Sequence, residues 1–379
     1  MLFRSVGFAL VALLSMVLSQ VADGLVSGLL VIGLPTNWVD HLASNSAWRM
    51  LMLAGMLPAF LTFFIRLFVP ESESWEQQKS LGKTSAWATR DLLGVLVGAL
   101  AAIVILWLWS RPDISILIRV VGTLVCLIVV TMGYLYPIRR YLHRSGDAPT
   151  EQKRILGRMG LAAMLSGISL LGTWGSIQWA PVWADQLSKQ VVEVSTTNDG
   201  TTDSASLAWR QSKNAKAWTQ FFSACGAIVS CLLAPLLCDF IGRRPTYAIL
   251  CVLALGATLL FYQGNSVFSP MFLVCIFLAG GATATFYGWL PLYLPELFPT
   301  RVRATGQGFG FNFGRILAAI GALQTAALMN WFSTLEDSPW LQNLQGGYPL
   351  ACSCMSLIYL VGMVAIWFAP ETRGKPMPE

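Results

Sequence analysis

Long apolar runs recur along this chain, and they constrain its fold more than any other feature. A helix that crosses a bilayer needs about 20 mostly apolar residues. Runs of this kind predict about ten membrane spans, at roughly 6–22, 48–68, 92–109, 114–136, 159–182, 217–238, 246–262, 270–294, 306–330 and 350–369. The first run is the least regular, because Gln20, Asp23 and Gly24 interrupt the apolar sequence that follows it. A signal peptide is the alternative for this segment, although no cleavage site of the A-x-A kind follows.

The composition agrees with a membrane protein. The 379 residues are 55% hydrophobic and 12% charged, whereas a soluble domain is about 25% charged. So few charges cannot cover a water-facing surface, which excludes soluble enzymes and nucleic-acid-binding proteins. Two histidines, and eight cysteines without a CxxC pair, predict neither a metal site nor a cofactor. We therefore expect an all-α integral membrane protein.

Lysine and arginine are concentrated in alternate loops. Most of those outside the spans lie at the N-terminus, in 70–91, in 137–158, in the turns near 243 and 301, and after 370. Because positively charged loops face the cytoplasm, we expect a cell-membrane protein with both termini cytoplasmic. The net charge of +6 then reflects topology and does not indicate a nucleic-acid partner.

Two further regions have distinct characters. Residues 92–136 predict a tight apolar hairpin, with its turn at Arg111-Pro112-Asp113, and we expect lipid-facing helices there. Residues 185–216 are rich in Ser, Thr, Asn and Asp, which predicts a mobile loop on the outer side. Trp183, just before this loop, is expected to be a membrane-interface anchor.

Three short motifs lie at the expected cytoplasmic ends of spans. They are Asp239-Phe240-Ile241-Gly242-Arg243-Arg244-Pro245, Pro295-Glu296-Leu297-Phe298-Pro299-Thr300-Arg301-Val302-Arg303, and Pro370-Glu371-Thr372-Arg373-Gly374. Pro70-Glu71-Ser72, after the second span, repeats the pattern of the last motif. Transporters are often built from repeats of six spans, so the two Pro-Glu motifs favour two related halves.

These motifs, in this order, resemble those of the major facilitator superfamily, in particular the sugar porters and the bacterial sialic acid permeases. The resemblance implies a helical bundle made of a partial N-terminal half, two inserted central helices and a complete six-helix C-terminal half. The first four superfamily helices are absent from the sequence. We expect either a start upstream of Met1, a truncated gene, or a chain that works with a partner.

The resemblance also implies domain boundaries. Residues 1–69 correspond to helices 5 and 6 of the N-terminal bundle. Residues 70–158 are expected to be cytoplasmic loops around the inserted hairpin 92–136, residues 159–370 the C-terminal six-helix bundle, and residues 371–379 a cytoplasmic tail.

By resemblance, the charged motif residues form a gate on the cytoplasmic side. Salt bridges among them would hold the inner gate shut in the outward-facing state, and would bias a conformational equilibrium although each exposed pair is weak. The alternative is that they only set topology. The gating residues expected are Asp239, Gly242, Arg243, Arg244, Glu296, Arg301, Arg303, Glu371 and Arg373.

Arg315 is the leading candidate for solute contact. It lies nine residues after Gly306, about 14 Å along the helix and so close to mid-bilayer, where a charge is costly. At 100° per residue, Asn312 and Arg315 lie opposite a face formed by Gly306, Gly310 and Gly314, which predicts close helix packing. An arginine there offers a bidentate fork for a carboxylate. The alternative is a structural arginine that pairs inside the protein.

Three further residues are candidates for the solute path. Trp174 and Gln178 lie four residues apart on one helix face, and an indole beside an amide suits a sugar. Tyr287 follows Gly280-Gly281 and precedes Pro291, which together suggest a bend in that helix.

The sequence therefore favours secondary transport of a sugar-like or carboxylate-bearing small solute by alternating access, with a sialic acid-like solute as one candidate. Proton coupling is implied by the resemblance alone. The alternative is a truncated, non-transporting remnant or a membrane sensor. A membrane-embedded enzyme is not expected, because paired His, Asp or Glu residues are absent from the spans. The expected partners are the solute, membrane lipid and protons as coupling ion.

Overall fold

The regular secondary structure of the described residues consists of helices. The structure is a computed structural model, and it describes residues 2–44, 91–111, 113–195, 214–334 and 344–378, with scattered residues between 49 and 80. The α-helices are α1 (Leu2–Val31), α2 (Thr36–Ala43), α5 (Leu92–Ser110), α6 (Ile116–Arg144), α7 (Pro149–Ser176), α8 (Ala180–Ser195), α10 (Ala215–Ile241), α11 (Arg243–Gly264), α12 (Pro270–Ala284), α13 (Phe286–Glu296), α14 (Thr300–Leu323), α15 (Thr325–Ser333), α16 (Tyr348–Ser356) and α17 (Ile358–Ala365). Two short 3₁₀ segments, η2 (Ile177–Trp179) and η3 (Ile366–Phe368), follow α7 and α17.

Seven of the predicted spans correspond to helical segments that are long and apolar enough to cross a membrane. They are Leu92–Ser110, Ile116–Arg144, Pro149–Lys189, Ala215–Ile241, Arg243–Gly264, Pro270–Glu296 and Tyr348–Phe368. The first predicted span lies in α1, whose apolar stretch is the shorter Ser5–Val17. The span at 48–68 lies mostly outside the described residues. The span at 306–330 is divided between α14 and α15 by a break at Gln324.

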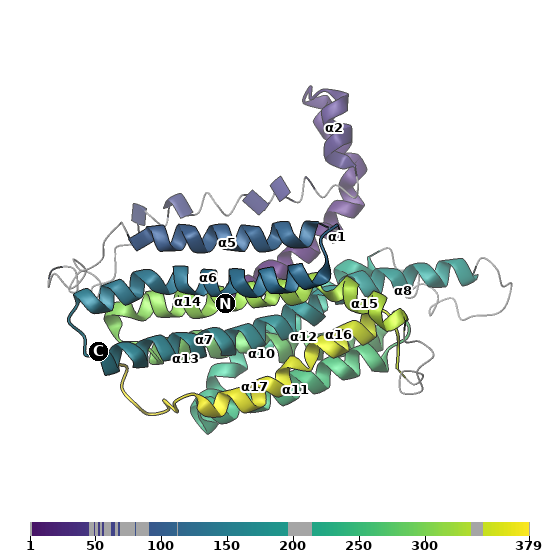
Figure 1. The fold of residues 1–379 in the computed structure, drawn as a ribbon. Coiled ribbons are helices and arrows are strands. Elements are labelled where there is room, and N and C mark those ends of the chain that lie inside the picture. Colours follow the sequence, from purple (N-terminus) through teal and green to yellow (C-terminus); the bar gives the residue numbers. More distant parts are fainter. Residues whose placement is uncertain are drawn as a thin grey trace.

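The long helices lie side by side in one bundle (Figure 1). α14 packs along α7, α12 along α10, and α5 along α6, while α1 lies against α10. α2 projects away from the bundle (Figure 1). Prolines in the first turns of α7, α12 and α16 suit these helix starts, because the first helical N–H groups have no partner within the helix. The all-α membrane bundle predicted from the apolar runs is confirmed.

Two segments expected to be loops contain helix. Residues 137–158 are helical except for the short connection 145–148, because Ile138, Tyr141 and Leu142 pack into the core of the bundle and extend α6. On the other side of the bundle, α8 continues to Ser195 and so covers the first eleven residues of the segment 185–216 predicted as a mobile loop. Residues 196–213 of that segment lie outside the described residues, and α10 begins at Ala215.

The glycines of α14 form the predicted packing face. A Cβ atom at Gly310 would lie 2.7 Å from the Cβ of Ala162, and one at Gly314 would lie 2.7 Å from the backbone nitrogen of Gly167. Both neighbours belong to α7, so the glycines let the two backbones approach closely. This contact fixes the rotation of α14 and therefore decides which way Asn312 and Arg315 face.

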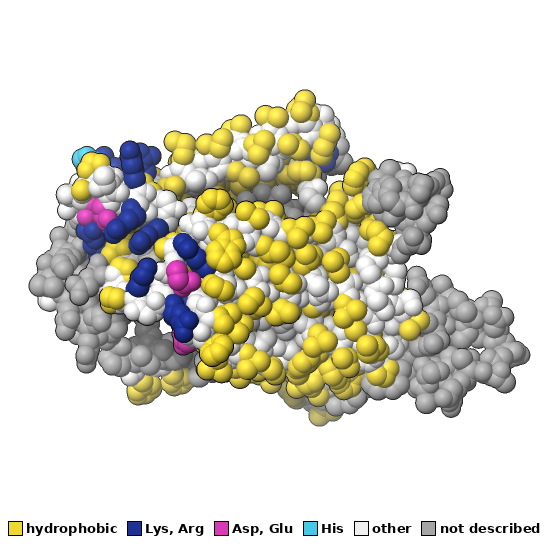
Figure 2. All heavy atoms as spheres, turned by 90° about the horizontal axis from the view of Figure 1, so that it is seen from below, with side chains coloured by type: hydrophobic (Ala, Val, Ile, Leu, Met, Phe, Trp, Pro, Cys, Tyr) yellow, Lys and Arg dark blue, Asp and Glu magenta, His cyan; other side chains and the backbone are white. Residues whose placement is uncertain are grey.

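Figure 2 shows how charge is distributed over one face of the bundle. Hydrophobic side chains cover most of the described surface, and Lys, Arg, Asp and Glu gather at one end (Figure 2). We call this the basic end, because it holds the arginines of the predicted gate, at the starts of α11 and α14. An apolar flank with charge at one end is the surface expected of a bilayer-spanning bundle.

Candidate functional site

A cavity of about 300 Å³ lies inside the bundle, and we call it the bundle cavity. Its walls come from α1, α7, α8, α10, α12 and α13, together with the 3₁₀ turn η2. The lining residues are Ser5, Phe8, Thr173, Trp174, Ile177, Gln178, Ala180, Pro181, Thr219, Gln220, Ser223, Ala224, Ala227, Gly280, Thr283, Ala284 and Tyr287. The described lining is therefore apolar, with neutral hydroxyl and amide groups as its polar part.

The structure brings three predicted solute residues together in this cavity. The indole Nε1 of Trp174 donates a hydrogen bond to the hydroxyl of Tyr287 at 2.8 Å, which joins α7 to α13. Gln178, in the 3₁₀ turn after α7, lines the same cavity. Thr173 supports the wall, since its hydroxyl contacts the backbone oxygens of Ser169 and Thr283 at 2.8 and 3.1 Å.

The other two predicted solute residues lie elsewhere. Asn312 and Arg315 are exposed on α14, on a face turned away from α7, and neither is among the residues that line the bundle cavity. Arg315 Nη1 contacts Asn312 Oδ1 at 3.3 Å, and its guanidinium lies over the ring of Phe311 at 4.9 Å. The predicted site is thus divided between the cavity and an exposed face of α14.

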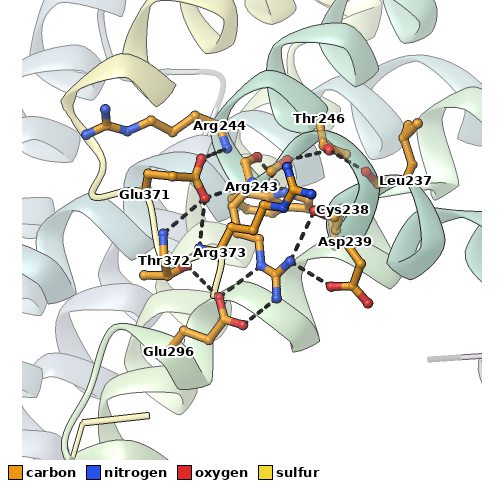
Figure 3. Close-up of polar contacts among 12 residues, drawn as sticks. Leu237, Cys238, Asp239, Arg243, Arg244, Thr246, Glu296, Glu371, Thr372 and Arg373 are labelled. Atoms are coloured by element: carbon orange, nitrogen blue, oxygen red, sulfur yellow. Dashed lines mark hydrogen bonds and ion pairs between the residues drawn. The ribbon is translucent and has the colours of Figure 1, made fainter. Parts of the chain in front are cut away.

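At the basic end, five residues form what we call the Arg243 cluster: Asp239, Arg243, Glu296, Glu371 and Thr372. The Arg243 side chain is 8% exposed, and its guanidinium contacts Glu296 Oε1 and Oε2 at 2.7 and 3.1 Å. It also donates to Asp239 Oδ1 at 2.8 Å and to the backbone oxygen of Cys238 at 3.1 Å (Figure 3). The cluster ties the α10–α11 turn to the end of α13.

Glu371 is held by backbone N–H groups (Figure 3). Its carboxylate accepts hydrogen bonds from the nitrogens of Arg243, Arg244, Thr372 and Arg373, each at 3.0 Å. Burial of this carboxyl acts to raise its pKa, but the four N–H donors outweigh burial and keep the pKa of Glu371 below its ordinary value. The segment after α17 is thereby fixed to the start of α11, whose helix dipole also favours an anion.

Gly242 makes this approach possible. Its φ of +101° is a conformation that favours glycine. A Cβ atom there would lie 3.2 Å from Glu371 Oε2. The α10–α11 turn therefore favours glycine at this position, because a side chain would crowd Glu371.

The remaining predicted gate residues use other partners. Arg301 pairs with Asp147 in the α6–α7 connection at 2.5 Å. Arg303 donates to the backbone oxygens of Phe298 and Pro378, and the Arg244 side chain donates to that of Ala369. Arg373 contributes its backbone N–H to Glu371. All of them lie at the basic end, but their side chains do not join the Arg243 cluster.

Several contacts of this region were not predicted. Trp289 Nε1 donates to the backbone oxygen of Arg243 at 2.9 Å, and the Tyr293 hydroxyl donates to that of Pro370 at 2.7 Å. The Thr372 hydroxyl contacts Glu296 Oε2 at 2.5 Å. Trp289 and Tyr293 lie four residues apart and face the same way on α13, a spacing that could have indicated a shared partner.

The described residues contain no group of three or more His, Cys, Asp or Glu side chains that could hold a metal ion.

The sequence of the chain is similar to those of known transporters. Residues 213–379 match the family described as "Sugar (and other) transporter". A putative metabolite transport protein of Haemophilus influenzae is 24% identical over 89% of this chain and 61% of its own length. A cis,cis-muconate transport protein of Acinetobacter baylyi is 23% identical over 80% of the chain and 55% of its own length. A probable 4-methylmuconolactone transporter of Cupriavidus pinatubonensis is 30% identical over 41% of the chain and 33% of its own length.

The chain spans less than two thirds of the length of these curated relatives. The family match nevertheless covers α10 to α17 and includes the Arg243 cluster. The matched region contains the three motifs that first indicated the resemblance, and it supports that resemblance. Over residues 213–379, the chain is similar to the sugar-porter-like transporters of the major facilitator superfamily.

Proposed function

We propose that this chain supplies the C-terminal part of a secondary transporter that moves a small, oxygen-rich organic solute across the cell membrane by alternating access. In this proposal residues 159–370 are the C-terminal six-helix bundle, residues 1–69 correspond to helices 5 and 6, and the hairpin 92–136 is inserted between them. The basic end faces the cytoplasm, because it carries the arginines.

The observation that carries the proposal is the bundle cavity. Its volume of about 300 Å³ is at the small end of ligand pockets, which favours a solute of metabolite size. Trp174 offers a flat apolar surface, while Gln178 and Tyr287 offer groups that hydrogen-bond to oxygen atoms. The names of two relatives, transporters of a muconate and a muconolactone, favour organic acids and their lactones beside sugars.

A carboxylate would need a positive partner outside the described cavity lining, which contains neither Arg nor Lys. We assign this role to Arg315, with Asn312 as its neighbour, because both are exposed on α14 and the guanidinium fork suits a carboxylate. The solute would then contact the cavity residues and the α14 face at different stages of transport, or would lie between the cavity and that face and contact both at once.

The gate of the proposed transporter is the basic end. The Arg243 cluster holds the ends of α10, α11 and α13 together with the segment after α17, and Arg244, Arg301, Arg303 and Arg373 extend these contacts. A network that forms in one state and breaks in the other biases the equilibrium between them. Proton coupling belongs to the proposal by resemblance only, and the described cavity lining contains no acidic residue to carry it.

Solute binding by the purified chain in lipid nanodiscs tests this function. A panel of hexoses, sialic acid, cis,cis-muconate and its lactones is screened by the shift in thermal unfolding, and positive compounds are measured by equilibrium binding. We expect saturable binding of at least one compound, weakened by Trp174→Ala and unaffected by Trp331→Ala, which truncates a tryptophan that is 55% exposed outside the cavity. Binding that both variants leave unchanged would contradict the assignment of the cavity.

A further inference from the structure

A second hollow, which we call the hairpin groove, lies on the α5–α6 hairpin and has a volume of about 750 Å³. One part of its lining is apolar, with Leu93, Val97, Val129 and Met132. The other part carries Arg139, Arg140 and His143 of α6, with Gln152 of α7 close by. The groove belongs to the flank of the bundle and shares no lining residue with the bundle cavity.

Two glycines form the floor of the groove. A Cβ atom at Gly133 would lie 2.5 Å from the backbone oxygen of Gly94, and one at Gly94 would lie 2.9 Å from that of Gly133. The two helix backbones therefore touch at this point. Side chains on either side of the contact, such as Val97 and Met132, stand above it and form the walls.

Helical spacing places the apolar and basic parts of the groove on one stripe of α6. Val129, Met132, Tyr136, Arg140 and His143 recur at intervals of three and four residues and so share a face. The opposite face of the same helix end is buried, since Ile138, Tyr141 and Leu142 are 0–1% exposed in the core. The groove face lies on the outside of the bundle, where Met132 and Val97 are 64% and 52% exposed.

The charges at the basic part of the groove are not balanced within the described chain. Arg144 is paired with Asp91, whose pKa is lowered by the hydrogen bond from Arg144 and also by the charge of Arg140. The nearby acids Asp147 and Glu151 pair with Arg301 and Arg154. Among the described residues, Arg139, Arg140 and His143 form no close salt bridge, and Arg140 acts on Asp91 only through its charge, so two arginines stand at the end of an apolar groove.

We propose that the hairpin groove binds one anionic phospholipid, whose headgroup phosphate contacts Arg139, Arg140 and His143 while an acyl chain lies over Gly94 and Gly133. An apolar trough that ends in guanidinium groups at a membrane edge matches a lipid with a charged headgroup. Because the other face of α6 is packed in the core, such a lipid would fasten the hairpin to the bundle.

Native mass spectrometry of the whole chain, released from micelles containing phosphatidylglycerol or phosphatidylcholine with the same acyl chains, tests the proposal. We expect one retained phosphatidylglycerol per chain and about tenfold less retention in the double variant Arg139→Ala/Arg140→Ala, because each arginine near an anionic headgroup contributes several-fold to binding. The matched control is Lys153→Ala/Arg154→Ala, which removes the same charge from exposed positions of α7 outside the groove and should retain the lipid.

Other outcomes of this experiment would overturn the proposal. Equal retention of the two lipids, or equal loss in both double variants, would show only general attraction to the basic end. Displacement of the lipid by inorganic phosphate alone would assign the arginines to a free anion. If the alanine variant does not fold, Val97→Trp provides a second test: it fills the apolar part of the groove, leaves the arginines in place, and should also reduce retention.

Discussion

The guanidinium of Arg243 contacts both carboxylate oxygens of Glu296, at 2.7 and 3.1 Å, across 53 positions of sequence. Arg243 begins α11 and Glu296 ends α13, so this bidentate pair fixes the ends of two helices against each other at the basic end. Both side chains are largely buried, at 8% and 13% exposure. Removing only one of these two charges would be costly, because the other would remain buried without an opposite charge to offset its loss of hydration.

Replacing Arg243 with alanine should loosen the basic end. Losing one partner of a buried pair costs about 3–5 kcal/mol, and the replacement also removes the contacts to Asp239 and Cys238. Cys238 is fully buried beside the cluster, so its alkylation by a thiol reagent reports the opening. In a chain that keeps Cys238 as its single cysteine, we expect faster alkylation with Arg243→Ala or Glu296→Ala than with the control Arg154→Ala. If solute binding falls sharply while alkylation stays slow, the cluster does not act as a gate.

Gly242→Ala should destabilise the α10–α11 turn. Its φ of +101° with a ψ of 168° and the 3.2 Å distance from a new Cβ to Glu371 both oppose a side chain, and we expect a loss of about 1–3 kcal/mol. Gly157→Ala is the matched control: a Cβ at this α7 position meets nothing within 4 Å, and alanine favours the helix by about 0.5–1 kcal/mol. Thermal unfolding monitored by tryptophan fluorescence compares them, and equal effects would contradict the steric argument.

The attachment of the segment after α17 should weaken in acid. The pKa of Glu371 is lowered in the folded chain, so its contribution to stability is present above the ordinary carboxyl pKa of about 4.3 and is lost as the pH falls through the lower folded value. The stability difference between wild type and Glu371→Gln should therefore be constant near neutral pH and shrink in acid. Glu151→Gln, at a carboxylate paired with the exposed Arg154, is the control. A difference that grows as the pH falls would contradict the assigned sign.

Much of the fold could be predicted because membrane spans can be recognised in a sequence as long runs of apolar residues. The apolar runs located seven helical segments, and the spacing of Gly306, Gly310 and Gly314 indicated the α14 face that packs on α7. The extension of α6 could not be predicted in this way, because basic residues surround Ile138, Tyr141 and Leu142, and only tertiary packing shows that these three are buried. The prediction that Trp183 is a membrane-interface anchor is wrong for the same reason. Its side chain is 5% exposed and packs in the core against Phe261, Tyr262 and Phe272.

Local spacing grouped two of the predicted solute residues. The sequence placed Trp174 and Gln178 on one helix face; in the structure Gln178 lies in the 3₁₀ turn after α7, and both residues line the bundle cavity. Helical periodicity gives the side of α14 on which Arg315 lies, but not which neighbour that side meets, so its separation from the cavity required the structure. The partner of Arg301 was equally inaccessible, because Asp147 approaches it only through the fold of the α6–α7 connection.

Arg315 should decide whether the solute is recognised as an acid. If it binds a carboxylate, Arg315→Ala removes a charge partner worth about 2–5 kcal/mol and should weaken binding more than tenfold. Arg315→Lys should restore part of the affinity, because it keeps the charge but loses the planar fork. Asn312→Ala should cost about 0.5–1.5 kcal/mol, one hydrogen bond. Binding of an acid and its amide analogue to each variant measures this. Retained preference for the acid in Arg315→Ala would return Arg315 to a structural role.

In the proposed function, the solute binds in the bundle cavity beside the Trp174–Tyr287 contact. The most direct measurement is the equilibrium dissociation constant of the best compound for wild type, Trp174→Ala and Tyr287→Phe, with Trp331→Ala as control. Truncating an aromatic contact residue costs about 2 kcal/mol, so we predict binding more than tenfold weaker for Trp174→Ala. Tyr287→Phe should weaken it a few-fold, because it removes one hydroxyl. Wild-type affinity in both cavity variants, or an equal loss in Trp331→Ala, would contradict solute binding in this cavity.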